Sequence, residues 1–486
     1  MNAYNNILSA LNTSRKVAEG EVPAVYFLGI GGIGMSALAR YFKWLGVVVS
    51  GYDKTETGLT KLLTAEGINI HYEDNIELVD RNAQIVIYTP AVPNDHQEYN
   101  YFLQNNYTVV KRSDVLGAIT NDSFNICIAG THGKTTTSTM VGHILRHSEF
   151  GCNAFLGGIA VNYNTNFWSS PNNVCVVEAD EYDRSFLKLS PDVAIISSMD
   201  PDHLDIYGTA ENMEQAFIDF SKRLKPEGLL ISKFGLKRSE SLGADKHLTY
   251  HLNDTNANVF ASNIKALNGS YRFDVIQNHP IAGNWMLKDV VLNMGGKHNI
   301  ENMIAAIAVA HYTGIEDVKI IEAVAAFKGV KRRFEYILKD DKQVYIDDYA
   351  HHPEELRALI SGAKAMFPNK KCNVIFQPHL FSRTRDLADG FAEVLDLADD
   401  IILLPVYPAR ELPMEGVSSG MILDRMHSED KIIMSKEEVL LHLKLEKAAH
   451  VEEGFEGMVL ITAGAGDIDT LVQPIREILE GGMRDE

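Results

Sequence analysis

The most informative feature of the sequence is a short run of residues whose types suit the binding of a nucleotide phosphate. The run is Gly130-Thr131-His132-Gly133-Lys134-Thr135, between an apolar segment (126–129) and a segment with helical periodicity. Glycines let backbone N–H groups approach an anion, and a helix N-terminus adds a positive potential. A lysine neutralises phosphate charge, and a threonine hydroxyl can hold Mg²⁺. The usual P-loop has a glycine where Ile128 stands, so a helix start without a ligand is the alternative on this run alone.

Acidic and histidine side chains follow two further apolar runs. Glu178 comes directly after residues 174–177, and His203 follows residues 193–197. Such runs are typical of strands covered on both faces in a parallel sheet, and ligands bind at the carboxyl ends of these strands. Carboxylates bind Mg²⁺ or Mn²⁺, although imidazole is an unusual ligand for Mg²⁺. A solvated acid and a hydrogen-bonded loop histidine are the alternatives at this stage.

A second glycine-rich turn lies near the start of the chain. Residues 25–28 predict a buried strand, residues 29–34 form the turn, a helix is expected over 35–45, and the next strand ends at Asp53. In dinucleotide-binding folds such a turn faces a diphosphate, and the acid binds a ribose hydroxyl. The pattern therefore predicts a Rossmann-like nucleotide site, with another ligand loop at Thr89 after the strand-like run 84–88.

Two loops rich in aromatic and cationic residues predict a further site toward the end of the chain. Residues 347–353 include Tyr349 and His351, and residues 377–386 include Arg383. Each loop follows a strand-like run, so both are expected at the carboxyl edge of one sheet. An arginine there suits a carboxylate substrate, which it can bind through paired hydrogen bonds. Each residue alone could be a surface residue, but two such loops together favour a site.

The order of these runs predicts an α/β protein of three domains, since 486 residues exceed one core. The expected domains are a Rossmann-like domain (1–112), a central P-loop domain with a parallel sheet (113–330), and a second Rossmann-like domain (331–486). A small β insertion is expected within 247–280, because Asn268-Gly269 is a hairpin signal between alternating runs. At the last boundary, Lys331-Arg332-Arg333 is either a solvated basic run or a group that reaches a phosphate.

Composition excludes several classes of protein. The net charge of −20 argues against a non-specific nucleic-acid or anionic-membrane surface. The four cysteines lack metal-binding spacing, which indicates free thiols in a reducing cytosol. The longest apolar stretch (25–39) is broken by glycines, so no membrane span is expected.

In these motifs and their order, the chain resembles the Mur ligase family from Val25 to about Asp469. The motifs are GIGGIGMSALA (29–39), AGTHGKTTT (129–137), EADEYDRSF (178–186), DPDHLDIYG (200–208), GKHNIENMIAA (296–306), RRFE (332–335), DDYAHHPEE (347–355), FQPHLFSRTRD (376–386) and TAGAGDID (462–469). A phosphate loop without the upstream glycine is the form that this family has. Several motifs in the right order are far more specific than any one of them.

The resemblance implies a role for each candidate residue. The diphosphate of a UDP-sugar would lie at Gly31, Gly32, Ile33 and Gly34, with Asp53 and Thr89 nearby. ATP would be bound by Gly130, Thr131, Gly133, Lys134, Thr135 and Thr136, with Asn299 and Asn302 by the adenine and Arg333 reaching a phosphate. The metal would be held by Thr135, Glu178 and His203. The amino acid would lie among Tyr349, His351 and Arg383, and the catalytic residues would be Lys134, His351 and Arg383.

The resemblance further implies an ATP-dependent ligase of peptidoglycan precursor synthesis, in the branch that joins L-alanine to UDP-N-acetylmuramate. ATP and Mg²⁺ or Mn²⁺ would be required, and the lactyl carboxylate would react through an acyl phosphate. The protein is expected to be a cytoplasmic monomer or homodimer, with no nucleic-acid partner and no membrane insertion.

Particular residues distinguish this function from the alternative functions of the chain. The branch that adds a recycled tripeptide to the same UDP-sugar usually has a different first glycine turn. A non-catalytic nucleotide-binding regulator would not need the intact Lys134, Glu178, His203 and Arg383, and a nicotinamide dehydrogenase leaves the phosphate loop unexplained. Residues 214–220 contain no lysine, so the carbamoylated lysine of some relatives is not expected; Leu380 stands where some relatives have a polar residue.

Overall fold

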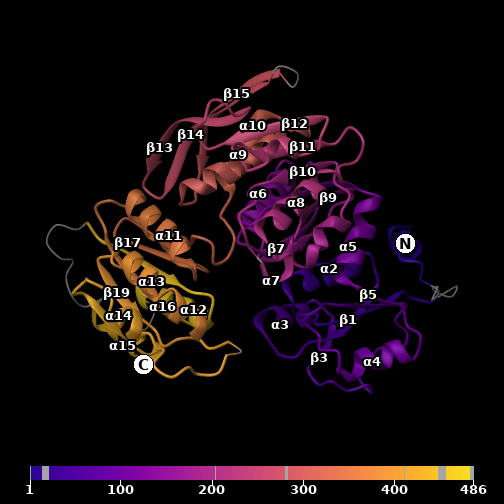
Figure 1. Ribbon diagram of the computed structural model, residues 1–486, viewed down its shortest axis with the longest axis horizontal. Helices are drawn as coiled ribbons and strands as arrows, with labels where there is room; N and C mark the ends of the chain where they lie inside the picture. The colour runs from indigo at the N-terminus through magenta and orange to yellow at the C-terminus, as the bar shows by residue number, and fades with distance from the viewer. Residues whose placement is uncertain are drawn as a thin grey trace. The chain divides into compact units, whose positions relative to one another are not determined.

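The computed structural model describes residues 2–13, 21–202, 204–279, 283–409, 411–446 and 456–481, and Figure 1 labels its helices and strands. Three β-sheets, of five, ten and six strands, follow one another along the chain. This confirms the predicted three-domain α/β fold, whereas the exact domain boundaries stay a prediction. By compactness the chain divides into two units: Met1–Ala261, Val275–Leu287 and Glu301–Val324 form the first, and Ser262–Asp274, Lys288–Ile300 and Ala325–Glu486 form the second.

The first sheet has the strand order β3-β2-β1-β4-β5, and all its strands run parallel. Residues 24–28 are all buried, because the apolar run forms a central strand covered on both faces. The strand order reverses beside β1, which places the ligand crevice at the loop after that strand. The elements of this part are α1 (Asn2–Ala10), β1 (Ala24–Leu28), α2 (Ile33–Trp44), β2 (Val48–Tyr52), α3 (Gly58–Ala65), β3 (Asn69–His71), β4 (Ile85–Tyr88), α4 (Gln97–Gln104), β5 (Val109–Lys111) and α5 (Arg112–Asn121).

The central sheet has the order β15-β14-β13-β12-β11-β10-β6-β9-β7-β8. Its middle strands are parallel, but β8 is antiparallel to β7. The sheet is therefore mixed: its centre is parallel, as predicted, and its β7–β8 edge is antiparallel, because a short connection there lets the chain turn straight back. Its first elements are β6 (Phe124–Ala129), α6 (Lys134–His147), β7 (Asn153–Ala160), β8 (Thr165–Trp168), β9 (Val174–Glu178), η1 (Tyr182–Lys188), β10 (Val193–Ile196), α7 (Leu204–Tyr207), α8 (Ala210–Ser221), β11 (Leu229–Lys233) and η2 (Ser239–Ser241).

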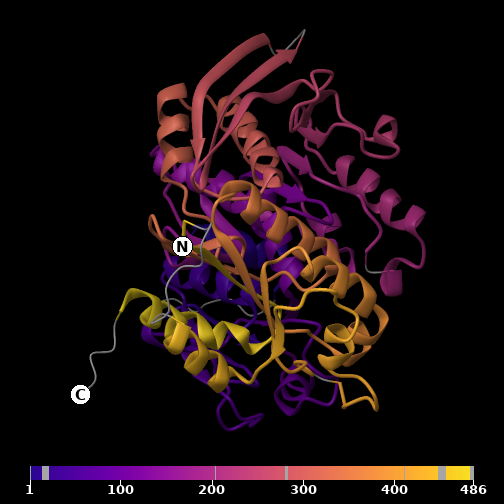
Figure 2. The ribbon, with the colours of Figure 1, turned by 90° about the vertical axis from the view of Figure 1, so that its left-hand side faces the viewer.

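The predicted β insertion is present, and it extends the central sheet. The strand β12 pairs in parallel with β11, so the sheet continues into β13, β14 and β15, the salmon strands of Figure 2. The hairpin turn at Asn268-Gly269 is confirmed, with Gly269 at φ +79°. The elements here are β12 (Lys246–His251), β13 (Val259–Leu267), β14 (Ser270–His279), β15 (Gly283–Leu292), α9 (Lys297–Tyr312) and α10 (Asp317–Ala326).

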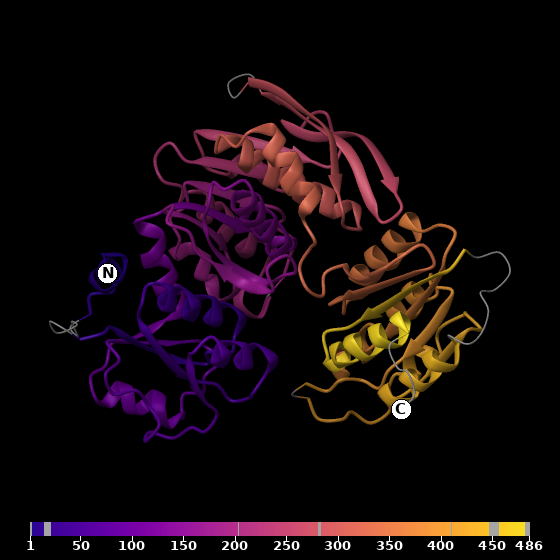
Figure 3. The ribbon, with the colours of Figure 1, turned by 180° about the vertical axis from the view of Figure 1, so that it is seen from behind.

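The third sheet has the order β16-β17-β21-β18-β19-β20, and only β16 among these strands is antiparallel to its neighbour. Its helices and strands can be followed in orange and yellow in Figure 3. The elements are β16 (Glu335–Lys339), β17 (Gln343–Asp348), α11 (Pro353–Met366), β18 (Lys371–Phe376), α12 (Phe381–Asp386), α13 (Ala388–Leu395), β19 (Asp400–Leu403), α14 (Gly420–Leu423), β20 (Lys431–Ile433), α15 (Lys436–Glu446), β21 (Met458–Ala463), η3 (Asp467–Leu471) and α16 (Val472–Glu480).

The first two sheets share one hydrophobic core within the first unit. The ring of Tyr41 on α2 lies 5.3 Å from the ring of Phe155 on β7 and 6.0 Å from that of Phe167 on β8. The helix that follows the first glycine turn is thus packed directly on the β7–β8 hairpin, and Figure 1 shows α2 beside β7. Among the described residues, no helix is long and apolar enough to cross a membrane.

Candidate functional site

The run 130–135 forms a tight loop between β6 and the start of α6. Gly130 and Gly133 have φ of +135° and +80°, a region that favours glycine. A Cβ atom at Gly130 would lie 2.1 Å from Oγ of Ser197, and one at Gly133 would lie 2.8 Å from Oδ1 of Asn302. Both positions therefore require glycine, which confirms that the run is a loop leading into a helix.

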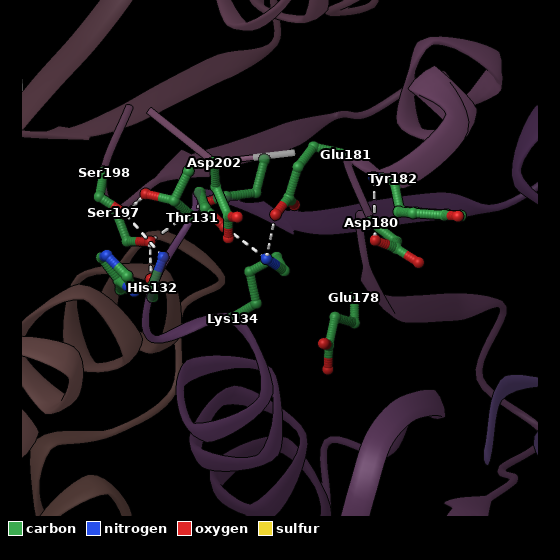
Figure 4. A network of polar contacts seen from close by, with 12 residues as sticks. Thr131, His132, Lys134, Glu178, Asp180, Glu181, Tyr182, Ser197, Ser198 and Asp202 are labelled. Atoms are coloured by element: carbon green, nitrogen blue, oxygen red, sulfur yellow. Dashed lines mark hydrogen bonds and ion pairs between the residues drawn. The ribbon is translucent and has the colours of Figure 1, made fainter. Parts of the chain in front are cut away.

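Two serines at the end of β10 hold this loop in place (Figure 4). Oγ of Ser198 accepts a hydrogen bond from the His132 N–H at 2.8 Å and lies 2.8 Å from Oγ1 of Thr131. Oγ of Ser197 donates to the Ala129 carbonyl at 3.2 Å. Sequence reasoning missed both serines. Their place at the carboxyl end of a predicted strand could have identified them as site residues.

Lys134 lies over the loop and is bound on two sides by the protein. Its ammonium donates to the Gly130 carbonyl and to Oε1 of Glu181, both at 2.7 Å. Glu181 is only 1% exposed, and burial raises the pKa of its carboxyl while the charge of Lys134 opposes that rise. An ammonium has three N–H donors, so this arrangement orients Lys134 and still leaves one donor for an anion.

The predicted metal ligands Thr135 and Glu178 are brought together. Oγ1 of Thr135 donates to Oε1 of Glu178 at 2.9 Å, and the N–H of Gly157 donates to Oε2 at 2.9 Å. His203, the third predicted ligand, lies outside the described residues. Within the described residues no group of three or more His, Cys, Asp and Glu could hold a metal ion.

The remaining residues predicted for ATP are more scattered. Thr136 is buried in the first turn of α6, and Asn302 on α9 faces Gly133 as described above. Nδ2 of Asn299 donates to the Gly295 carbonyl at 2.6 Å, and Asn299 is 2% exposed. Asn299 and Arg333 belong to the second unit, so their predicted contacts with ATP stay predictions.

The first glycine turn is also built as a loop before a helix. Gly32 is the N-cap of α2, so Ile33 and Gly34 open that helix two residues before the predicted Met35. Oδ2 of Asp53 accepts a hydrogen bond from the Gly31 N–H at 2.7 Å. Asp53 therefore stabilises the turn. The sequence pattern predicted only a contact between Asp53 and a ribose, and it did not indicate this structural role.

Two further side chains border this turn. A Cβ atom at Gly29 would lie 2.7 Å from Cγ2 of Thr89, so the predicted loop residue Thr89 does adjoin the turn. A Cβ atom at Gly34 would lie 3.2 Å from Nη1 of Arg112, and Nη2 of the same side chain lies 3.7 Å from Oδ2 of Asp180. Sequence reasoning missed Arg112, although it is the cation beside Gly34.

The residues predicted to bind the amino acid lie together in the second unit. The rings of Tyr349 and His351 are 5.3 Å apart, and His351 is 6.2 Å from the ring of His379. The charge of Arg383 on α12, after burial, contributes to lowering the pKa of His379. Among the described residues, no hydrogen bond or ion pair engages the Arg383 guanidinium, which suits it to an incoming anion.

Sequence reasoning did not assign two further residues, His379 and Arg332, to the amino-acid cluster. Nδ1 of His379 is buried without a hydrogen-bond partner among the described residues. The sequence feature that could have identified His379 is its place in the loop after β18. Arg332 lies 5.1 Å above the Tyr349 ring and 3.4 Å from Oδ2 of Asp347. Burial raises the pKa of Asp347 to about 7, although its hydrogen bond from Thr462 and the charge of Arg332 oppose the rise.

Three family models match successive parts of the chain, in the same order as the three sheets. The model described as Mur ligase family, catalytic domain, matches residues 24–124. The Mur ligase middle domain matches residues 128–310, and the Mur ligase, glutamate ligase domain, matches residues 332–466.

Individual relatives align over nearly the full length. The chain is 46% identical over 464 residues to the UDP-N-acetylmuramate–L-alanine ligase of Flavobacterium johnsoniae, covering 94% of this chain and 98% of that protein. It is also 46% identical over 463 residues to the enzyme of that name from Porphyromonas gingivalis, covering 94% and 99%.

Solved structures of similar fold include two ligases. The UDP-N-acetylmuramate–alanine ligase of Thermotoga maritima has a TM-score of 0.77 at 29% identity, covering 95% of this chain and 100% of that one. A murein peptide ligase from Psychrobacter arcticus has a TM-score of 0.64 at 21% identity, covering 96% and 100%, a likeness of fold alone. With family models matched along most of its length and relatives at 46% identity, this chain belongs to the Mur ligase family.

Proposed function

We propose that the protein is an ATP-dependent ligase that joins L-alanine to the lactyl carboxylate of UDP-N-acetylmuramate in peptidoglycan precursor synthesis. The observation that carries the proposal is the phosphate loop, with Lys134 over it and Thr135 paired to Glu178, in a chain that aligns over 94% of its length with ligases of that name. Alanine as the acceptor rests on the names of those relatives.

ATP binds with its phosphates at the loop between β6 and α6. The backbone N–H groups at the start of α6 face the anion, and the remaining donor of Lys134 neutralises its charge. The proposed ATP-binding residues are Gly130, Thr131, Gly133, Lys134, Thr135, Thr136, Asn299, Asn302 and Arg333. Glu181 acts on this site by orienting the lysine.

The residues beside the loop fit a magnesium ion. The hydroxyl of Thr135 and the carboxylate of Glu178 supply hard oxygen donors 2.9 Å apart, which Mg²⁺ prefers. We assign the ion to Thr135, Glu178 and His203. When bound, the ion reduces the repulsion between the ATP phosphates and the substrate carboxylate.

The UDP-sugar binds at the first glycine turn, with its diphosphate at residues 31–34 and Asp53 and Thr89 at the border of the turn. Its lactyl carboxylate attacks the γ-phosphorus of ATP, which gives an acyl phosphate and ADP. The alanine amine then attacks the acyl carbon, and the tetrahedral intermediate expels phosphate to leave an amide. Both steps place charge on phosphoryl or acyl oxygens, which fixed cations stabilise.

The alanine binds beside Tyr349, His351 and Arg383. The guanidinium of Arg383 pairs with the alanine carboxylate through parallel hydrogen bonds. The amine must lose a proton before it attacks, and an imidazole of this cluster can accept it. Burial lowers the pKa of His379, which keeps that imidazole neutral at neutral pH and able to accept.

The compartment and assembly follow from the same proposal. All four cysteines are free and buried, which supports a reducing cytoplasm. The substrates ATP, UDP-N-acetylmuramate and L-alanine are the only partners proposed, and the protein acts as a monomer or a homodimer.

The experiment is phosphate release from ATP with Mg²⁺ and UDP-N-acetylmuramate across a panel of acceptors. We expect release with L-alanine to exceed that with glycine, L-serine or a murein tripeptide. Release driven by the tripeptide instead would assign the chain to the recycling branch. Absence of any acceptor-dependent release, with UDP-N-acetylmuramate binding intact, would leave a nucleotide-binding regulator.

A further inference from the structure

The β7–β8 hairpin of the central sheet makes a buried polar contact with helix α2. Asn166 on β8 is fully buried, and its Nδ2 donates to the Ile33 carbonyl at 2.6 Å and to Oγ of Ser36 at 2.9 Å. Ile33 is the first residue of α2 and a member of the turn proposed to hold the diphosphate. Asn166 therefore reaches from the ATP-binding sheet into the backbone of the UDP-sugar turn.

The other end of the Asn166 amide is also occupied. Its Oδ1 accepts a hydrogen bond from Nη1 of Arg40, which lies further along α2. The Nε and Nη2 atoms of Arg40 bind both carboxylate oxygens of Glu66, at 2.6 to 3.1 Å. Each polar atom of the Asn166 side chain thus has a partner, and a fully satisfied buried network specifies a single geometry.

The same hairpin also holds the proposed metal carboxylate. The N–H of Gly157 on β7 donates to Oε2 of Glu178 at 2.9 Å, on the side away from Thr135. A Cβ atom at Gly157 would lie 2.3 Å from that oxygen, so only glycine lets the strand approach so closely. One hairpin therefore contacts the turn for the UDP-sugar and the carboxylate for the metal.

From these contacts we infer that Asn166 is a positioning residue for the UDP-sugar, acting through the Ile33 carbonyl and Ser36. It holds the diphosphate turn at a set distance from the phosphate loop, and the hairpin is the spacer between them. The inference rests on the proposed function. Phosphoryl transfer needs the attacking oxygen about 3 to 3.5 Å from phosphorus, and an error of about 1 Å can cost roughly 100-fold in rate.

The test is Asn166→Asp, which keeps the size of the side chain and the acceptor for Arg40 but replaces the amide donor with a carboxylate. We expect the Kd for UDP-N-acetylmuramate, measured by calorimetry without ATP, to rise roughly tenfold, and kcat to fall by at least as much. The KM for ATP should stay within about twofold, because the phosphate loop is not touched. The matched control is Asn164→Asp, at an exposed position in the turn of the same hairpin, which should behave as the wild type.

A second variant protects the test against a folding defect. Ser36→Ala removes one buried hydroxyl, which accepts from Asn166 and donates to the Ile33 carbonyl. It should raise the same Kd by roughly threefold with the ATP KM unchanged. If Ser36→Ala, or a folded Asn166→Asp, lowers only the melting temperature, the contact is structural and the inference is wrong. An equal loss of affinity for UDP-N-acetylmuramate and for ATP would also overturn the inference. Absence of UDP-sugar binding by the wild type would instead overturn the proposed function, and the inference with it.

Discussion

Lys134 is the residue whose charge the proposed chemistry uses most directly. In Lys134→Ala the phosphate loop loses its cation during phosphoryl transfer, and we expect ligation to fall on the order of 1000-fold or more. The measurement is phosphate release with saturating substrates, with circular dichroism to check the fold. Lys61→Ala, at a lysine whose side chain is 65% exposed on α3, is the control and should be unaffected. Turnover within about tenfold of the wild type would remove Lys134 from the chemistry.

Arg383 is the residue assigned to the alanine carboxylate. Arg383→Lys keeps the charge but loses the planar fork, so the KM for alanine should rise roughly tenfold, equivalent to about 1.4 kcal/mol. The KM values for ATP and UDP-N-acetylmuramate should change little. The matched control is Arg385→Lys in the same helix, where the side chain is exposed and paired with Asp386. A raised ATP KM with an unchanged alanine KM would assign Arg383 to the phosphate site instead.

At the scale of the element, the end of β10 shapes the loop that precedes α6. Ser198→Ala would leave the His132 N–H without its acceptor and the loop less constrained. A lost hydrogen bond of about 1 kcal/mol predicts an ATP KM raised roughly fivefold, with the UDP-sugar KM unchanged. Ser198→Thr keeps the hydroxyl and should restore the wild-type value. Ser148→Ala, a buried serine at the far end of α6, is the control; an equal effect there would mean that general loosening of the helix is responsible.

At the scale of the whole molecule, buried carboxyls make stability depend on pH. Glu98 is fully buried, and burial raises its pKa from 4.5 to about 7, partly opposed by a hydrogen bond from Tyr26. A raised pKa means that the folded state binds the proton more tightly. The stability from this group is therefore fully present below pH 4.5 and lost as the pH rises to about 7. The raised pKa values of Asp347 and Asp348, about 7 and about 6, act in the same direction.

The expected result is a melting temperature of the wild type that falls relative to that of Glu98→Gln between about pH 5 and about pH 8. Glu98→Gln removes this titrating group and leaves the others, so the difference between the two melting temperatures reports the contribution of Glu98 alone. For a side chain as buried as Glu98, the shift corresponds to roughly 3 kcal/mol. Parallel curves for the wild type and the variant would show that Glu98 keeps an ordinary pKa in the folded protein.

Much of the architecture was already contained in local patterns. The apolar runs that became β1, β6, β9 and β10 were predicted within a few residues, because strands buried on both faces leave a continuous apolar signal. Glycines at 130 and 133 were placed in a loop because the phosphate motif requires backbone without side chains, and their positive φ values agree. The order of these motifs also led to the family.

Contacts between distant segments could not be predicted in the same way. Nothing near Asn166 in the sequence points to Ile33, which is 133 residues away, and nothing near Lys134 points to Glu181. The antiparallel β8 and the continuation of the central sheet into β15 also depend on which edges meet. Local sequence determines which segments are strands, turns and helix starts, since those depend on neighbouring residues. Only the tertiary structure decides which side chain orients a catalytic group, because that partner is selected by packing between elements far apart in the chain.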